Sequence, residues 1–340
     1  MTASAAKWGN YPLPEQLPAP VIGDPALPLV SIVTPSYNQG RFIRETINSV
    51  LGQDYPNVEY WVIDGGSTDE TITILREYEH DARFHWISEP DRGQSDAINK
   101  GWRRSRGEIL AWLNSDDTYL PGAIRAHVQA LRQHQDCGVV YGDALYIDEQ
   151  GQPLYTAYGR PYDILELLRL TIPSQPTTFL RKTICEAIGP INEHFKYSMD
   201  SEYWVRAAKI TGFWYQPGAK ATYRLHDRSK TIANHDRFYH DWLAILDGFY
   251  ADSDMACRYK DHKPSIYADV YSTMAALELR QGSLKKGLEY FSKSIKIGAV
   301  RPRMFTVLLA LIDRNTSLNL SSRFVQWWTH IRSRRTPSAH

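Results

Sequence analysis

Three short polar clusters in this 340-residue chain have the side chains for chemistry, and each follows an apolar run. They are Thr34-Pro35-Ser36-Tyr37-Asn38, Asp64-Gly65-Gly66-Ser67 and Asn114-Ser115-Asp116-Asp117. Adjacent carboxylates such as Asp116 and Asp117 repel each other unless a cation or hydrogen-bond donors compensate. Hard oxygen ligands suit Mg²⁺ or Mn²⁺, which commonly bridge to phosphates. This pair therefore predicts a metal–phosphate site, and the alternative is a plain helix cap before Pro121.

Two further acids, Asp96 and Asp200, each stand near the start of a predicted helix. Either one can serve a ligand, or it can simply cap the helix or complement its dipole. Gly65-Gly66 can likewise let the backbone approach a ligand or merely form a tight turn. Taken singly, these positions leave both interpretations open.

The elements that must position these residues alternate between strand and helix. Strands are predicted at 29–34, where Pro35 stops the first one, and at 58–63, 84–87 and 108–113, with helices at 40–53, 70–78, 95–104 and after Pro121. This rhythm is typical of βαβ units and predicts an α/β fold with a mainly parallel central sheet. Ligands bind beyond the carboxyl ends of such strands, so we expect the three clusters to share one crevice.

The pattern changes after residue 138. Strands at 139–143, 144–147, 177–180 and 221–225, and a helix at 201–210, predict a mixed second half, and the chain beyond 236 is helical. We therefore expect a proline-rich arm at 1–28, one domain at 29–235 with halves 29–137 and 138–235, and a helical region at 236–340.

The helical region contains two features with open alternatives. Residues 275–295 resemble a single tetratricopeptide helix pair, but helices that simply pack on the main domain are favoured because stable arrays need several repeats. Residues 323–335 combine Trp327, Trp328 and Ile331 with four arginines. This is either an interfacial helix that makes peripheral membrane contact or a helix packed on its own protein with a solvated basic tail.

Composition excludes several classes of protein. The 39 Lys+Arg and 38 Asp+Glu give a net charge of +1, which argues against a nucleic-acid binder. The three cysteines are far apart and form neither a disulfide framework nor a zinc motif. No signal peptide or membrane-spanning run is recognised, so a cytoplasmic protein is expected. Neither a G-x-G-x-x-G nor a P-loop motif is present.

Taken together, the motifs resemble a family 2 glycosyltransferase with the A-type nucleotide-diphospho-sugar fold. The resemblance runs from about Pro28 to Lys230. It rests on the three clusters with the strands before them, on the Glu89-to-Gly93 and Asp96-to-Gly101 segments, on Gln175-Pro176-Thr177, on the segment around Asp200 and on Tyr223-Arg224-Leu225-His226. Several motifs in the family's order make a far more specific signal than any one motif.

The resemblance implies a role for each matched position. Residues 29–137 would form the nucleotide-binding half and 138–235 the acceptor half. The nucleotide-sugar residues would be Thr34, Pro35, Tyr37, Asn38, Asp64, Gly65, Arg92, Asp96, Asn114, Ser115 and Asp116. Asp200 matches the catalytic base. Asp116 would bind Mn²⁺ or Mg²⁺, with His226 and Asp117 as further metal candidates. Asn114 departs from the family's usual D-x-D pattern and removes one negative charge.

The implied activity is inverting transfer of a sugar from a UDP-, GDP- or TDP-linked donor to a hydroxyl group. Saccharides, lipid-linked saccharides and proteins are the implied acceptors, and bacterial surface polysaccharide or glycoconjugate synthesis is the implied setting. Two alternatives remain. One is a nucleotidyltransferase on the same fold, although the loop after the first strand has a single glycine and a single arginine. The other is a non-catalytic nucleotide-sugar-binding or scaffold protein.

Overall fold

The computed structural model describes residues 8, 17, 19–169, 171–226, 235–297 and 307. The chain divides into two compact units. Unit 1 comprises Met1–Ile164 and Ile172–Ala233, and unit 2 comprises Leu165–Thr171 and Asn234–His340. The predicted boundary at residue 235/236 lies close to this division, whereas the assignment of Leu165–Thr171 to the second unit has no counterpart in the sequence pattern.

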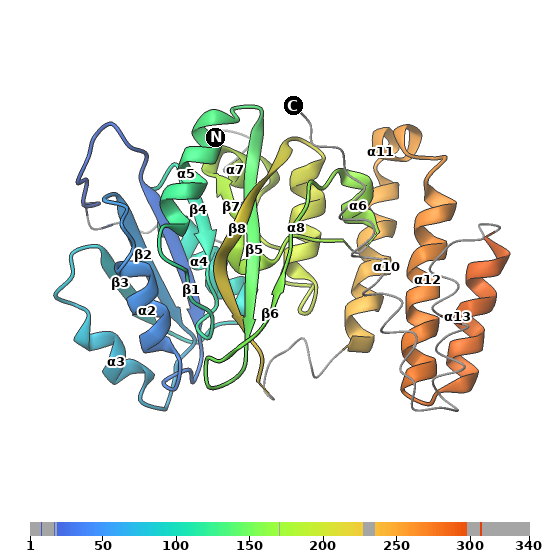
Figure 1. Ribbon diagram of the computed structural model, residues 1–340, viewed down its shortest axis with the longest axis horizontal. Coiled ribbons are helices and arrows are strands. Elements are labelled where there is room, and N and C mark those ends of the chain that lie inside the picture. Colours follow the sequence, from blue (N-terminus) through green and yellow to red (C-terminus); the bar gives the residue numbers. More distant parts are fainter. Residues whose placement is uncertain are drawn as a thin grey trace. The chain divides into compact units, whose positions relative to one another are not determined.

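Unit 1 is built on one sheet of eight strands (Figure 1). The strands are β1 (Val30–Ser36), β2 (Val58–Asp64), β3 (Phe84–Ser88), β4 (Ile109–Trp112), β5 (Cys137–Ile147), β6 (Pro153–Ala157), β7 (Phe179–Arg181) and β8 (Gly212–Arg224). Their order is β3-β2-β1-β4-β7-β5-β6, and β8 pairs with β5. The pairs β1–β2, β1–β4, β2–β3 and β5–β8 are parallel, and β7 and β6 run antiparallel to their neighbours.

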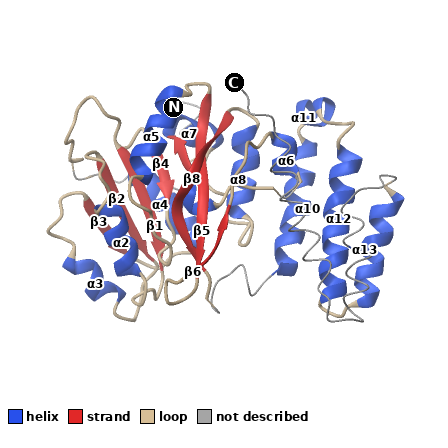
Figure 2. Ribbon diagram, viewed as in Figure 1, coloured by secondary structure: helices blue, strands red, loops and turns tan. Residues whose placement is uncertain are grey.

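Helices cover both faces of this sheet (Figure 2). They are α2 (Ile43–Leu51), α3 (Thr71–Glu77), α4 (Gln94–Arg104), α5 (Ala123–Gln133), α7 (Lys182–Ile188) and α8 (Met199–Ala208), with a short 3₁₀ turn, η1 (Gln175–Thr177). Because side chains alternate along a strand, every second residue faces each helix group. Val30, Ile32 and Val62 join the core beneath α2, α3 and α5.

The other face packs on α4 and α8. Gly101 brings α4 so close that a Cβ there would lie 2.4 Å from Val33 Cγ1, which only glycine avoids. Trp112 of β4 stacks on Trp204 of α8 with ring centroids 5.1 Å apart, and Trp102 of α4 contacts Trp112 edge-on. These aromatic contacts fix both helices relative to the end of β4.

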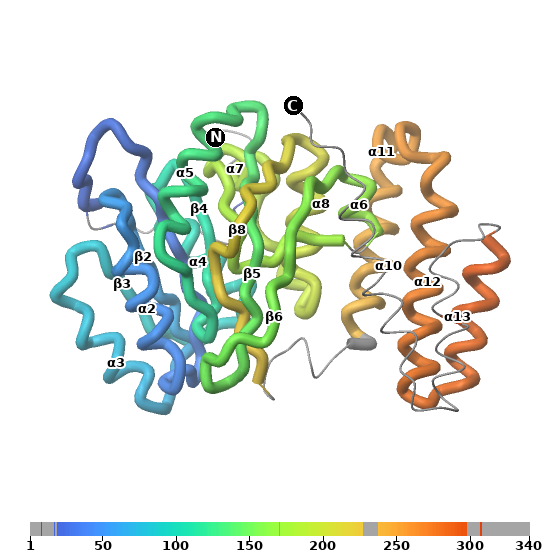
Figure 3. Tube along the Cα trace, in the orientation of Figure 1, coloured from blue at the N-terminus to red at the C-terminus, as the bar shows by residue number. Residues whose placement is uncertain are grey.

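Four strands differ from the sequence expectation. The strands predicted at 139–143 and 144–147 are one continuous strand, β5, and β6 was not predicted. β1 continues through Pro35 to Ser36 instead of stopping. This is tolerated because β4 pairs with β1 only as far as Val33, so Pro35 faces β2 alone. β8 begins at Gly212, well before the predicted 221, because Pro217-Gly218 hides the strand pattern. The trace in Figure 3 shows β5 and β8, far apart in sequence, lying side by side.

Unit 2 is helical in its described part. It contains α10 (His235–Ala251), α11 (Ser253–Arg258), α12 (Lys263–Arg280) and α13 (Leu284–Lys296), and α6 (Ile164–Leu168) falls almost wholly in its Leu165–Thr171 segment. The predicted helix pair is present: α12 and α13 are antiparallel, with the Oγ atoms of Ser272 and Ser294 2.8 Å apart and Gly287 close to Leu279. Trp242 is buried and its Nε1 donates to Leu168 O at 3.3 Å.

Two sequence expectations fall outside these ranges. The basic segment 323–335 is not among the described residues, and most of the arm at 1–28 is not either. None of the helices in the described ranges is both long enough and apolar enough to cross a bilayer.

Candidate active site

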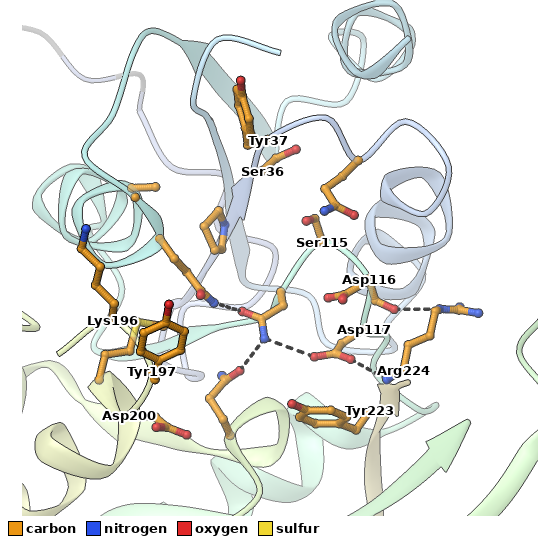
Figure 4. A pocket seen from close by; sticks show the side chains of 18 of the residues that line it. Ser36, Tyr37, Ser115, Asp116, Asp117, Lys196, Tyr197, Asp200, Tyr223 and Arg224 are labelled. Atoms are coloured by element: carbon orange, nitrogen blue, oxygen red, sulfur yellow. Dashed lines mark hydrogen bonds between the residues drawn. The ribbon is translucent and has the colours of Figure 1, made fainter. Parts of the chain in front are cut away.

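A cavity of about 430 Å³ lies at the carboxyl ends of β1 and β4 (Figure 4). Segments from both halves of unit 1 line it: Pro35, Ser36, Tyr37 and Gln39; Asp91, Gly93, Gln94 and Ala97; Asn114, Ser115, Asp116 and Asp117; Gln175; Lys196, Tyr197, Met199 and Asp200; and Tyr223, Arg224 and His226. Its volume is typical of a small-molecule site. The cavity is therefore the place where polar groups from distant parts of the sequence converge.

Asn114 connects three of these segments. Its Oδ1 accepts a hydrogen bond from Gln94 Nε2 at 2.6 Å, and its Nδ2 lies 3.2 Å from Gln175 Oε1 and 3.4 Å from Asp117 Oδ2 (Figure 4). An aspartate here would place a second carboxylate against Asp117 and could not donate to it. The amide therefore explains in physical terms why this chain departs from D-x-D at this position.

Asp117 is an internal support of the turn. It is buried, and its Oδ1 accepts the backbone N–H of Arg224 at 2.9 Å. Burial raises the pKa of Asp117 well above its ordinary value, and the neighbouring Asp116 adds to that rise. The Asp117 carboxylate thus ties the turn after β4 to the end of β8.

Asp116 and His226 form the second polar pair of the cavity. Asp116 Oδ2 and His226 Nε2 are 3.0 Å apart, and the Asp116 side chain is 22% exposed. The pair is held from behind by Arg224, whose Nε donates to Asp116 O at 2.9 Å and whose Nη2 pairs with Glu45 Oε2 at 2.5 Å. Phe42 of the loop before α2 packs its ring against both Arg224 and His226.

These two side chains supply an oxygen and a nitrogen donor that face the same space. In the described ranges, no group of three or more His, Cys, Asp or Glu side chains is arranged to hold a metal. A cation here would therefore take two protein ligands, and the rest would come from the substrate or water. Mg²⁺ and Mn²⁺ sites on phosphate substrates are often built in this way, so the donor set fits.

Asp200 enters the cavity from the first turn of α8. Its Oδ1 accepts the Ser201 N–H at 2.7 Å and lies 3.3 Å from Ser201 Oγ. Burial raises the pKa of the Asp200 carboxyl above its ordinary value, and the Ser201 hydrogen bonds only partly oppose this. The aromatic contacts of Trp204 on the same helix hold Asp200 in place against the sheet.

The structure gathers some of the predicted site residues and not others. Among those lining the cavity are Pro35, Tyr37, Asn114, Ser115, Asp116, Asp117, Asp200 and His226. Thr34, Asn38, Asp64, Gly65, Arg92 and Asp96 lie outside the lining. The expectation that all three polar clusters share one crevice thus holds for the first and third clusters and not for the second.

The residues outside the lining have internal partners. Asp64 is fully buried, and its Oδ2 accepts Gly66 N, Ser67 N and Ser88 Oγ at 3.0, 2.8 and 2.7 Å. Thr34 Oγ1 lies 2.9 Å from Tyr60 Oη. The predicted nucleotide contacts of these residues stay predictions.

Asn38 and Asp96 shape the loops beside the cavity. Asn38 has a left-handed φ of 52°, and its Oδ1 accepts Thr68 N at 2.9 Å. Asp96 accepts the N–H and the guanidinium of Arg92 at 2.9 and 2.7 Å. Burial opposes its ionisation, but Arg92 and Lys100 outweigh burial and hold the pKa of Asp96 below its ordinary value.

Several lining residues were not predicted from the sequence. Arg224 and Gln94 act through contacts across long stretches of chain, and Lys196 adds a cation from the loop before α8. Arg224 belongs to the Tyr223-to-His226 motif at the end of a predicted strand, so its place two residues before His226 was the one available signal. A single lysine in a loop has no spacing that would mark it.

Comparison with known proteins gives a consistent result. Residues 31–189 match the model of a family described as glycosyl transferase family 2. An uncharacterised glycosyltransferase of Mycobacterium tuberculosis is 30% identical over 54% of this chain and 70% of that protein. Another of Rickettsia felis is 29% identical over 62% of this chain, and TuaG of Bacillus subtilis, a putative teichuronic acid biosynthesis glycosyltransferase, is 35% identical over 37%. The chain spans 36% of the R. felis protein and 51% of TuaG.

Two solved structures share the fold at low sequence identity. The mannosyltransferase PcManGT of Pyrobaculum calidifontis, in complex with GDP-Man and Mn²⁺, has a TM-score of 0.61 at 19% identity. The match covers 96% of this chain and 88% of the PcManGT chain. TarS 1–349 of S. aureus, in complex with UDP-GlcNAc, has a TM-score of 0.60 at 17% identity. That match covers 87% of this chain and 91% of the TarS chain. These likenesses confirm the predicted A-type fold with a mainly parallel central sheet.

Proposed function

Since the chain belongs to glycosyl transferase family 2, we propose that it moves a sugar from a nucleoside-diphosphate donor to an acceptor hydroxyl, with inversion at the anomeric carbon. One observation carries the proposal: Asp116 with His226, and Asp200, line the same cavity although they lie far apart in the sequence. A metal-binding pair and a carboxylate base are the two chemical functions that such a transfer needs.

The donor would lie with its diphosphate at the Asp116 end of the cavity. Asp116 and His226 would hold a divalent cation there. When bound, such a cation stabilises the negative charge that develops on the departing diphosphate. The structural neighbours that carry UDP-GlcNAc, or GDP-Man with Mn²⁺, support a nucleotide sugar as the donor class.

Asp200 would act on the acceptor. A carboxylate placed by hydrogen-bond distance from the attacking hydroxyl can take its proton as general base. The raised pKa of Asp200 brings its basicity closer to neutral pH, which strengthens it in this role. A single displacement with the base on the acceptor side inverts the anomeric configuration.

Arg224 would position this chemistry without touching the sugar. Its side chain is 2% exposed and contacts the Asp116 backbone, Glu45 and the Phe42 ring. It therefore fixes the turn that presents the Asp116 carboxylate. The similarity to TuaG supports a polysaccharide or another saccharide-containing molecule as the acceptor class.

A panel of UDP-, GDP- and dTDP-sugars tests the proposal. Thermal shifts are recorded with Mn²⁺ and with EDTA, because ligand binding stabilises the folded state by mass action. We expect one nucleotide class to raise the melting temperature in Mn²⁺ more than in EDTA, and the matching donor to release nucleoside diphosphate when acceptor is added.

Other outcomes contradict the proposal and indicate the alternatives. Release of pyrophosphate from a nucleoside triphosphate would indicate a nucleotidyltransferase. Binding of a donor that is never hydrolysed or transferred would indicate a binding protein.

A further inference from the structure

Three tyrosines form one row across three neighbouring strands of unit 1. Tyr146 of β5 is in register with Tyr155 of β6 on one side and with Tyr223 of β8 on the other. The ring centroids of Tyr146 and Tyr155 are 4.6 Å apart and those of Tyr146 and Tyr223 are 4.7 Å apart, with interplanar angles of 13° and 16°. The three rings therefore stand parallel, one on each strand.

The inner end of the row lies in the cavity. Tyr223 lines it together with Asp200 and Gln175 (Figure 4). Burial raises the pKa of Tyr146, and the nearby Tyr155, Asp117 and Asp200 raise it further. Tyr223, at the inner end of the row, thus shares the cavity with the proposed base Asp200, where an acceptor hydroxyl would lie.

The outer end of the row lies at an open edge. β6 is the last strand in the sheet order, and Tyr155 is 54% exposed. Cross-strand aromatic pairs stabilise sheets, but they do so best when both rings are covered. Tyr155 is not among the residues that line the cavity, so the stacked rings connect Tyr223 in the cavity to this exposed edge of the sheet.

We propose that this tyrosine row is an acceptor subsite that binds the sugars following the one that is glycosylated, so that the acceptor is an oligosaccharide or polysaccharide chain. The proposal rests on the proposed transferase function and deepens it. Because the rings stack on one another, the row would offer a sugar chain their edges and hydroxyl groups, and the half-exposed Tyr155 would add the ring face that does not stack on Tyr146 as an apolar surface for C–H groups. The row extends the site by two strand spacings, about 10 Å, which is more than a single sugar needs.

A series of acceptor lengths tests this subsite. The probes are oligomers of glucose, galactose, mannose and N-acetylglucosamine, from one to six units, used with the donor that the nucleotide-sugar panel identifies. In the wild-type protein we expect the acceptor KM to fall as the chain lengthens beyond one sugar. In Tyr155→Ala the KM for the longer oligomers should rise roughly five- to tenfold, while kcat and the donor KM stay unchanged.

Two variants make the test specific. Tyr155→Phe keeps the ring and should retain the length dependence. Tyr158→Ala removes a tyrosine three positions away that is 76% exposed and lies outside the row, and it should behave as the wild type.

Three results would overturn the proposal. In the first, Tyr155→Ala loses no more affinity than Tyr158→Ala. In the second, the wild type shows no length dependence. In the third, no oligomer is bound although donor hydrolysis proceeds, which would reject the saccharide-chain acceptor and leave the transferase function standing. Absence of donor turnover in the wild type would instead count against the transferase function itself.

Discussion

The acidic residues of unit 1 fall into two groups that look alike in sequence and differ in structure. Asp64 and Asp96, beside the β1–β3 half of the sheet, use both carboxylate oxygens on partners within the chain. Asp116 and Asp200, beside β4 and β8, line the cavity, and each makes its side-chain contacts through a single oxygen, with His226 and with Ser201. Both groups follow strands or begin helices.

From this difference we infer that an acid at a strand end is not necessarily a ligand. What matters is whether its lone pairs are already used. Redirecting Asp64 toward a ligand would leave several buried donors without an acceptor, which is costly. Asp116 and Asp200 can meet a ligand at a much smaller cost, and the variants below test that distinction.

The largest effect is expected for Asp200→Asn. Loss of a general base typically lowers turnover by about 10²- to 10⁴-fold. Donor binding should be retained, because Asp200 is assigned to the acceptor. Steady-state kinetics with donor titration calorimetry measures both quantities, and Asp54→Asn, an exposed acid paired with Arg125, serves as control. Near-normal turnover would remove Asp200 from the role of base.

The next effect is expected for Asp116→Ala. Donor affinity in Mn²⁺ should fall by roughly 10- to 100-fold, and in EDTA the variant and the wild type should bind alike. His226→Ala should shift affinity in the same direction. Calorimetric titration of the donor in both buffers gives the comparison. An equal loss of donor affinity in Mn²⁺ and in EDTA would show that Asp116 acts on the fold and not on a metal.

Asp64→Asn should mainly lower the stability of the fold, whereas Asp116→Ala should mainly lower donor affinity. The amide has one acceptor oxygen where the carboxylate has two. It cannot accept both the three donors on Oδ2 and the Ser67 hydroxyl on Oδ1, so the free energy of unfolding should drop by about 1–3 kcal/mol. Donor affinity should fall less than it does in Asp116→Ala. Urea unfolding and calorimetry on one preparation measure both. A variant that is fully stable yet fails to bind donor would show that Asp64 contacts the nucleotide, as the family resemblance implies.

The smallest effect concerns pH. Because burial raises the pKa of Asp200, the folded state holds this proton more tightly than the unfolded chain does. Between the ordinary pKa and the raised one, the Asp200 contribution to stability is therefore lost as the pH rises. Asp200→Asn should melt at a higher temperature than the wild type at neutral pH, and the gap should close toward pH 4. If the difference in melting temperature between Asp200→Asn and the wild type instead widened toward acid pH, the pKa of Asp200 would not be raised in the folded state.

Much of the fold was predictable because its signals are local. The runs that became β1, β2 and β4 are short, apolar and bounded by polar turns, and the alternation of strand and helix implied a parallel sheet. The first part of β8 was missed because Pro217 and Gly218 interrupt its strand pattern. Pro35 was predicted to end β1 because the sequence does not reveal that this part of β1 pairs with β2 alone.

The site was predictable only in part for a related reason. The rule that ligands bind at strand ends located Asn114 and Asp116, and motif order supplied Asp200. Contacts across the fold decide the rest: Arg224 meets Glu45 179 positions away, and Asn114 meets Gln175 61 positions away. No local pattern encodes such pairs. For the same reason the sequence did not distinguish Asp64, whose oxygens are used internally, from Asp116.

A crystal of the Asp200→Asn variant grown with Mn²⁺ and the identified nucleotide sugar would test the central claim most directly. The manganese anomalous signal should lie on Asp116 and His226, against the diphosphate, and the sugar should point toward residue 200 in the same cavity. A cation or diphosphate found elsewhere, for example at the turn after Asp64, would contradict the account.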